Sequence, residues 1–205
     1  MSQRCVVICA DDFGQHEGIN NACLQLARQG RISAVSCLTG GPSWSEAGDT
    51  VARLARLPVD LGLHLDFTDY TMDEGLRHPL GALIGLAFSR RLDGARVGRE
   101  INAQLDAFER VAGRAPDHVD GHQHVHQFPV IRHQLLQALA RRYPDCKPWI
   151  RRTAATAIAG TPRLKPVVIE RLGGEALSRQ AQRENFRQNL HLHGVYGFDA
   201  DEAGY

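Results

Sequence analysis

The sequence lacks a long apolar run, because no hydrophobic stretch reaches the roughly 20 residues that a helix needs to cross a bilayer. It also lacks an excess of charge of one sign, since 24 Lys and Arg stand against 23 Asp and Glu, with no basic block. A transmembrane segment and a nucleic-acid partner are therefore not expected. The start, MSQRCVVICADDFG, has only a short apolar segment before two aspartates. It predicts a buried strand and not a signal peptide.

Cysteine is scarce, with five residues and no CxxC pair. This usage is typical of buried, reduced thiols in a cytoplasmic protein. The 205 residues suffice for one sizeable domain, and we expect a single domain over residues 1–205.

Strand-like and helix-like segments alternate along the chain, which predicts a parallel α/β sheet or barrel. The loop at 66–96 is long enough to indicate a functional role, and its segment 82–88 favours a short helix. Strands are expected at 5–10, 33–38, 59–65, 116–120, 148–152 and 166–171, and helices at 17–29, within 43–57, and at 97–111, 129–142 and 175–188.

Polar side chains follow several of these strands. Asp11 and Asp12 end the first strand, His64 ends the third, and Asp120 and His122 end the fourth. Because sites gather at the carboxyl ends of parallel strands, we expect these side chains to converge. Taken alone, Asp11-Asp12 also suits a turn, and His64 also suits a hydrogen-bonded core histidine that Asp66 could orient.

The stretch DGHQHVHQF, residues 120–128, places an aspartate and three histidines at every second position. Residues two apart on a straight strand lie roughly 6.5–7 Å apart, whereas zinc holds nitrogen ligands at about 2.0–2.1 Å. Either the chain bends, or only one or two of these groups bind a metal. Together with His118 the imidazoles would be costly to bury without partners, so metal binding is favoured over a solvated loop. One carboxylate and two imidazoles would leave positions open for water and substrate, which predicts metal-assisted hydrolysis.

The ordered set ADDFG at 10–14, EGIN at 17–20, SAVSCL at 33–38, GLHLDFT at 62–68 and HVDGHQHVHQFP at 118–129 resembles the YdjC-like carbohydrate deacetylases. That family includes chitooligosaccharide deacetylases and hopanoid-biosynthesis-associated members. The resemblance runs from about residue 5 to 152. It implies an α/β fold, a distorted (β/α) barrel of the glycoside hydrolase/deacetylase type. No clear closing strands follow Gln188, so an incomplete barrel is expected. The implied reaction removes an N-acetyl group from an amino sugar, an oligosaccharide or a glycolipid headgroup.

The resemblance also implies the roles of the site residues. Asp12, His64 and His122 would bind one divalent ion, Mg²⁺ or Zn²⁺, and Asp11 would be the base. Four further residues would contact the substrate or support the ligands: Asp120, His124, His126 and Arg151. Asp120 would orient an imidazole. Arg151, or equally Arg152, would hold the base in position.

The chain departs from the family pattern in two places. Gln15-His16 follows DDFG where many members have a small polar residue, and the ending DADEAGY has no His-Pro-Gly segment to protonate the departing amine. His193 is a poor substitute. These departures indicate a truncated form, or a member that replaces the acid and the missing wall by other means, such as a neighbouring subunit. A homo-oligomer is expected because an incomplete barrel would expose apolar strand faces. The alternative is a sugar-binding or regulatory relic that keeps the metal site. A phosphoesterase is disfavoured, because no Arg/Lys clamp or Gly-rich phosphate loop accompanies the ligands.

Overall fold

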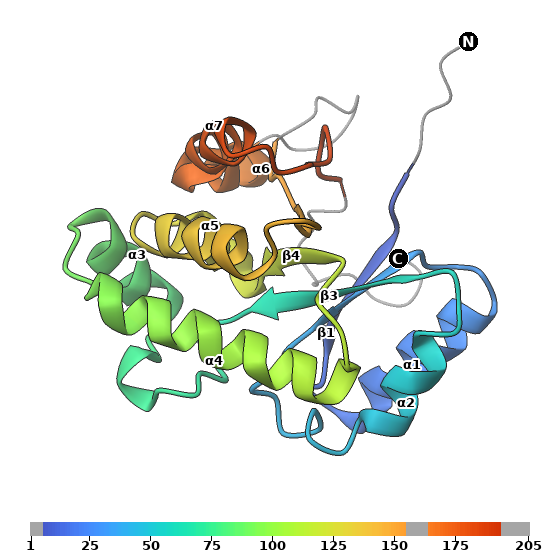
Figure 1. Ribbon diagram of the computed structural model, residues 1–205. Helices are drawn as coiled ribbons and strands as arrows, with labels where there is room; N and C mark the ends of the chain where they lie inside the picture. Colours follow the sequence, from blue (N-terminus) through green and yellow to red (C-terminus); the bar gives the residue numbers. More distant parts are fainter. Residues whose placement is uncertain (1–5, 155–163, 194–205) are drawn as a thin grey trace, which may run out of the picture.

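A computed structural model describes residues 6–154 and 164–193 of the chain. Five parallel strands form one sheet in the order β1-β2-β3-β4-β5 (Figure 1). The strands are β1 (Cys9–Phe13), β2 (Ala34–Cys37), β3 (Asp60–Leu65), β4 (His118–Gly121) and β5 (Trp149–Ile150).

Helices connect successive strands as far as β5, as parallel pairing requires, and further helical segments follow β5. In chain order they are α1 (Glu17–Arg28), α2 (Gly48–Leu54), the 3-10 turn η1 (Glu74–Leu76), α3 (Leu80–Phe88), α4 (Gly94–Ala112), the 3-10 turn η2 (His122–Gln127), α5 (Ile131–Arg142), α6 (Leu164–Ile169), the π-helical turn η3 (Glu170–Gly174) and α7 (Glu175–Arg183). Figure 1 shows α1, α2 and α4 along one side of the sheet, and α5 to α7 beyond β4.

The two faces of the sheet differ in polarity. Leu61, Leu63 and Leu65 alternate along β3 and are buried in the hydrophobic core. The residues between them, Gly62 and His64, face the opposite side. Register pairs Gly62 with Ser36 and His118, and His64 with Asp120. A row of polar side chains therefore lines one face of the sheet and runs toward its carboxyl edge.

The expected α/β class is confirmed. Among the described residues the sheet does not close, which fits the expected distorted, incomplete barrel. One additional bridge joins Ile150 to Gln188 beyond β5. Within these same ranges, none of the helices combines the length and hydrophobicity that crossing a bilayer would need.

Two strand predictions are wrong. The first strand lies at Cys9–Phe13 and not at 5–10, and Val6, Val7 and Ile8 are exposed instead of buried. The segment 166–171 belongs to α6 and η3. Its β-branched residues suggested a strand, but local β preference is weak and gives way to tertiary context.

The remaining differences are smaller. The last helix ends at Arg183, so the expected end at 188 is too late. Cys23 and Cys37 are buried as free thiols, but Cys146 is exposed, which contradicts the expectation that all the thiols are buried.

Candidate metal and catalytic site

Asp11 and Asp12 lie in a bulge of β1. Ala10 pairs with Val35 and Phe13 with Cys37, so β1 carries one residue more than β2 between these pairs. Asp12 adopts a φ of 65°, a conformation that non-glycine residues rarely take. A bulge re-aims the side chains next to it. This extra residue brings two adjacent carboxylates to the same side of the sheet, which a regular strand cannot do.

His64 is held by its neighbour on β4. His64 and Asp120 are register partners, and the Nδ1 of His64 lies 2.6 Å from Oδ1 of Asp120. The other ring nitrogen, Nε2, lies 3.4 Å from Oδ1 of Asp12. Both His64 and Asp120 are buried. Burial alone would lower the pKa of His64, but the charge of Asp120 and the contacts with both aspartates outweigh it and raise the pKa to about 10.

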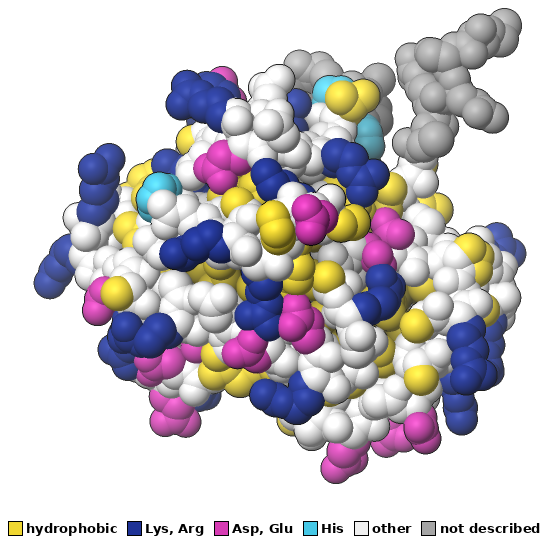
Figure 2. Space-filling view, in the orientation of Figure 1, with side chains coloured by type: hydrophobic (Ala, Val, Ile, Leu, Met, Phe, Trp, Pro, Cys, Tyr) yellow, Lys and Arg dark blue, Asp and Glu magenta, His cyan; other side chains and the backbone are white. Residues whose placement is uncertain are grey.

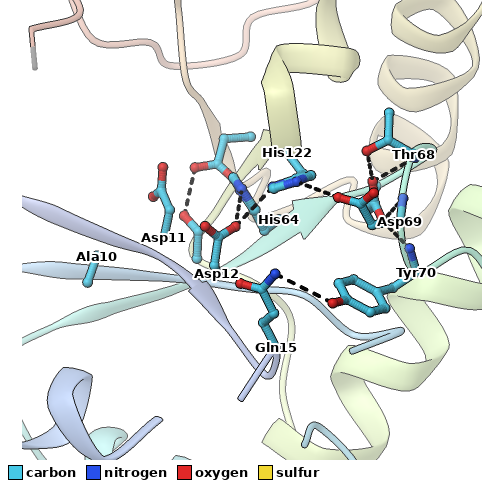
Figure 3. A network of polar contacts seen from close by, with 12 residues as sticks. Ala10, Asp11, Asp12, Gln15, His64, Thr68, Asp69, Tyr70 and His122 are labelled. Atoms are coloured by element: carbon cyan, nitrogen blue, oxygen red, sulfur yellow. Dashed lines mark hydrogen bonds and ion pairs between the residues drawn. The ribbon is translucent and has the colours of Figure 1, made fainter. Parts of the chain in front are cut away.

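The chain bends where β4 ends. Gln123 and His124 take positive φ values of 50° and 61°, so η2 turns away from the strand direction directly after His122. The Nδ1 of His122 lies 3.0 Å from Oδ1 of Asp12. The imidazoles of His64 and His122 therefore meet at one carboxylate oxygen (Figure 3). Because of this bend, the alternate side chains of DGHQHVHQF point in different directions and need not share one face, as they would on a straight strand.

The geometry of Asp12, His64 and His122 suits a divalent cation. Ligand atoms about 2.0–2.2 Å from one zinc ion lie about 2.9–3.5 Å from each other at ordinary coordination angles. The observed 3.0 Å and 3.4 Å between Asp12 and the two ring nitrogens fall in that range. The donor set of one carboxylate and two imidazoles also suits zinc, manganese, cobalt or nickel. Asp12, His64 and His122 would therefore hold the ion.

Arg151 follows β5 and reaches the two other aspartates. Its guanidinium donates two hydrogen bonds to Asp11, of 2.6 and 2.7 Å, and lies 2.7 Å from Oδ2 of Asp120. Burial would raise the pKa of Asp11, but the hydrogen bonds and charge of Arg151 lower it below its ordinary value. Asp11 also lies within 4.8 Å of a ligand atom of His64. Of the two arginines considered from the sequence, Arg151 reaches the site, whereas the backbone of Arg152 bonds to Asn189.

His124 and His126 lie behind the site, on η2. The Nε2 of His126 lies 2.9 Å from the carbonyl oxygen of Arg151, so this fully buried ring braces the backbone that carries the arginine. Burial lowers the pKa of His124 to about 3 and that of His126 to about 4, so both rings are neutral at pH 7. Neither ring is among the groups that approach Asp12.

Ser36 and Asp69 were not singled out in the sequence. The Ser36 hydroxyl donates a 2.6 Å hydrogen bond to Asp120 and lies 2.9 Å from Nε2 of His118. Gly62 makes room for that contact, because a Cβ there would lie 2.3 Å from the His118 ring. Asp69 Oδ2 lies 2.9 Å from Nε2 of His122. Asp66, considered as a partner of His64, instead accepts hydrogen bonds from the loop that carries Asp69.

An alignment of the predicted strands could have pointed to Ser36, because Ser36 pairs with Gly62 on the next strand and Gly62 pairs with His118. No sequence pattern marks Asp69. The expected absence of a C-terminal His-Pro-Gly segment concerns residues 194–205, which lie outside the described residues. His193 is exposed beside His191.

Comparison with known proteins agrees with the motifs. The sequence model of the YdjC-like protein family matches residues 5–204. The chain is 34% identical over 152 residues to a carbohydrate deacetylase of Mus musculus, covering 65% of this chain and 46% of that protein. It is 30% identical over 144 residues to a chitooligosaccharide deacetylase of Yersinia pestis (strain Pestoides F), covering 68% of this chain and 56% of that protein. The chain thus spans about half the length of these relatives.

A solved structure shares the fold. A protein from Enterococcus faecalis V583, described as a candidate cellobiose-phosphate cleavage protein, superposes with a TM-score of 0.56 at 20% identity. The superposition covers 93% of this chain and 81% of that one. With the family match across nearly all of its residues, the chain belongs to the YdjC-like protein family.

Proposed function

We propose that this chain carries the site of a metal-dependent carbohydrate deacetylase, which hydrolyses the N-acetyl group of an amino sugar, an oligosaccharide or a glycolipid headgroup. The observation that carries the proposal is the meeting of His64 and His122 on one oxygen of Asp12, with Asp11 held beside them by Arg151. The names of the mouse and Yersinia relatives support the substrate class.

Asp12, His64 and His122 hold one divalent cation, Zn²⁺ or Mg²⁺, in this proposal. When bound, the cation would polarise the amide carbonyl and lower the pKa of water. His64 and His122 must be deprotonated to serve as ligands, and each already has a carboxylate on the nitrogen that faces away from Asp12. Such carboxylates fix the ring orientation and strengthen the imidazole as a ligand.

Asp11 is the proposed base. A carboxylate must be ionised to take a proton from the attacking water, and Arg151 keeps Asp11 in that state at neutral pH. The two-point contact also fixes both oxygens of Asp11, so that the accepting lone pair has a defined direction. Arg151 weakens the basicity of Asp11 while orienting it, so its contribution is positional.

Substitution of Asp11 and Asp12 separates these roles. Asp11→Asn should leave metal content unchanged and reduce acetate release by about 10²–10⁴-fold, the usual contribution of a general base. Asp12→Ala should reduce both metal content and acetate release. Metal content is measured by elemental analysis, and acetate release with N-acetylated chitooligosaccharides as substrate. Asp49→Asn, an exposed aspartate at the start of α2, is the matched control and should behave as wild type.

Acetate release that survives Asp11→Asn would contradict the role of the base. A wild-type chain that binds metal and saccharide but releases no acetate would instead favour the sugar-binding relic. Phosphoesters tested in parallel address the third class, and their turnover in place of acetate release would overturn the deacetylase assignment.

A further inference from the structure

Asp69 lies in the loop after β3, on the side of His122 that faces away from Asp12. Its carboxylate is 2.9 Å from Nε2 of His122, while Nδ1 of the same ring is 3.0 Å from Asp12. His64 shows the same arrangement, with Asp120 on one nitrogen and Asp12 near the other. Figure 3 shows His122 between Asp12 and Asp69, with a contact to each carboxylate.

The backbone around Asp69 is fixed by the Asp66 carboxylate. One oxygen of Asp66 accepts two 2.8 Å hydrogen bonds, from the backbone N–H and the hydroxyl of Thr68. The other oxygen accepts hydrogen bonds from the backbone N–H groups of Asp69 and Tyr70. The Asp69 side chain is 44% exposed, and its carboxylate contacts His122. The turn fixes the position of the backbone from which this side chain reaches the imidazole.

Two buried polar residues of α4 anchor this turn. Gln104 accepts a 3.0 Å hydrogen bond from the backbone N–H of Asp66 and donates a 2.7 Å bond to its carbonyl. Glu100 accepts hydrogen bonds from the backbone N–H groups of Met72 and Asp73, on the far side of Asp69. Gln104 is 1% and Glu100 2% exposed. Buried polar groups need partners, and these two find theirs in the backbone of the loop.

We infer that Asp69 is a positioning residue for His122, held in place by α4 through the Asp66 turn. Its carboxylate accepts a hydrogen bond from Nε2–H, which leaves the lone pair of Nδ1 directed at the site beside Asp12. This inference rests on the proposed function, because it assigns a second supporting carboxylate to the same metal site. It adds the loop after β3, and the face of α4 beneath it, to the machinery that shapes the site.

The test measures zinc affinity by competition with a chromophoric chelator. Asp69→Ala should weaken zinc binding about 10–100-fold, the usual effect of losing a carboxylate behind a histidine ligand. Asp69→Asn, whose amide oxygen can still accept from Nε2–H, should recover part of that loss. Asp49→Asn is the control, because this exposed aspartate lies at the start of α2, outside both the loop after β3 and α4. It should bind zinc as wild type does.

Zinc affinity of Asp69→Ala within twofold of wild type would overturn the inference while leaving the proposed metal site intact. A wild-type chain that binds neither zinc nor magnesium would instead contradict the proposed function. In that case a crystal structure of Asp69→Ala decides the inference alone. A His122 ring that leaves Asp12 supports it, and a ring that keeps the 3.0 Å contact overturns it.

Discussion

At the scale of single residues, Asp120 is the most heavily supported group of the site. It is 0% exposed and is contacted by Ser36, His64 and Arg151. Burial would raise the pKa of Asp120, but the charges of Arg151 and His64 outweigh it and hold the pKa well below its ordinary value. Asp120 is therefore ionised within the protein and depends on Arg151 for its counter-charge.

Arg151→Met should destabilise the fold by about 3–5 kcal/mol, because it leaves a buried carboxylate without its cation. Urea unfolding followed by circular dichroism measures the change. Arg152→Met is the matched control, because Arg152 makes no ion pair within residues 6–154 and 164–193. This substitution should lower the free energy of unfolding far less. Equal losses from the two substitutions would refute the counter-charge role.

At the scale of elements, α4 connects the core to the site. Asp93 caps its start, and Gly113 ends it at a φ of 68°. Apolar residues of α4 pack into the core, while Glu100 and Gln104 hold the loop after β3. A further tie joins α4 to α5, where Glu109 accepts hydrogen bonds from Arg142 and Tyr143.

The tie between α4 and α5 should make stability depend on pH. Hydrogen bonds from Arg142 lower the pKa of Glu109 from its ordinary 4.5, against the opposite effect of burial and with help from Tyr143. A carboxylate with a lowered folded-state pKa stabilises the protein above the unfolded pKa and loses that contribution as pH falls through the folded value. Wild type should therefore exceed Glu109→Gln in stability by about 0.5–1 kcal/mol at pH 7.

The comparison of wild type and Glu109→Gln is made by urea unfolding between pH 7 and pH 3. The gap should shrink below about pH 4.5, the unfolded-state value. A gap that stays constant over this range would show that Glu109 acts through packing and not through its charge.

The elements and the principal site residues could be predicted from the sequence for physical reasons. Apolar strand-like segments alternate with helix-like segments along the chain, and this order predicts parallel strands. Parallel strands bring Asp12, His64 and Asp120 to one edge of the sheet. The bulge at Asp11-Asp12 could not be predicted, because one extra residue in a strand leaves the pattern of residue types almost unchanged. Asp69 was missed because its place depends on the Asp66 turn and α4, which are contacts across long stretches of chain.

At the scale of the whole molecule, the sheet is open and β1 lies at its edge. Val6, Val7 and Ile8 precede β1 and are 76%, 49% and 55% exposed. Figure 2 shows basic and acidic side chains interspersed over the face in view, with hydrophobic side chains between them. Exposed apolar side chains beside an open strand edge favour pairing with another chain.

We therefore expect the chain to self-associate through this edge. Light scattering after size exclusion should give a mass above that of one chain, and Val7→Glu should lower it. Leu26→Glu, on the partly exposed face of α1, is the control and should leave the mass unchanged. A mass of one chain at all concentrations would contradict the expectation.

We propose that Asp12, His64 and His122 bind one cation. A crystal of the wild-type protein grown with zinc, with anomalous scattering recorded at the zinc edge, tests it most directly. We predict a single strong peak within bonding distance of Oδ1 of Asp12, Nε2 of His64 and Nδ1 of His122. A zinc ion bound by other residues, or these three groups without a peak between them at saturating zinc, would contradict it.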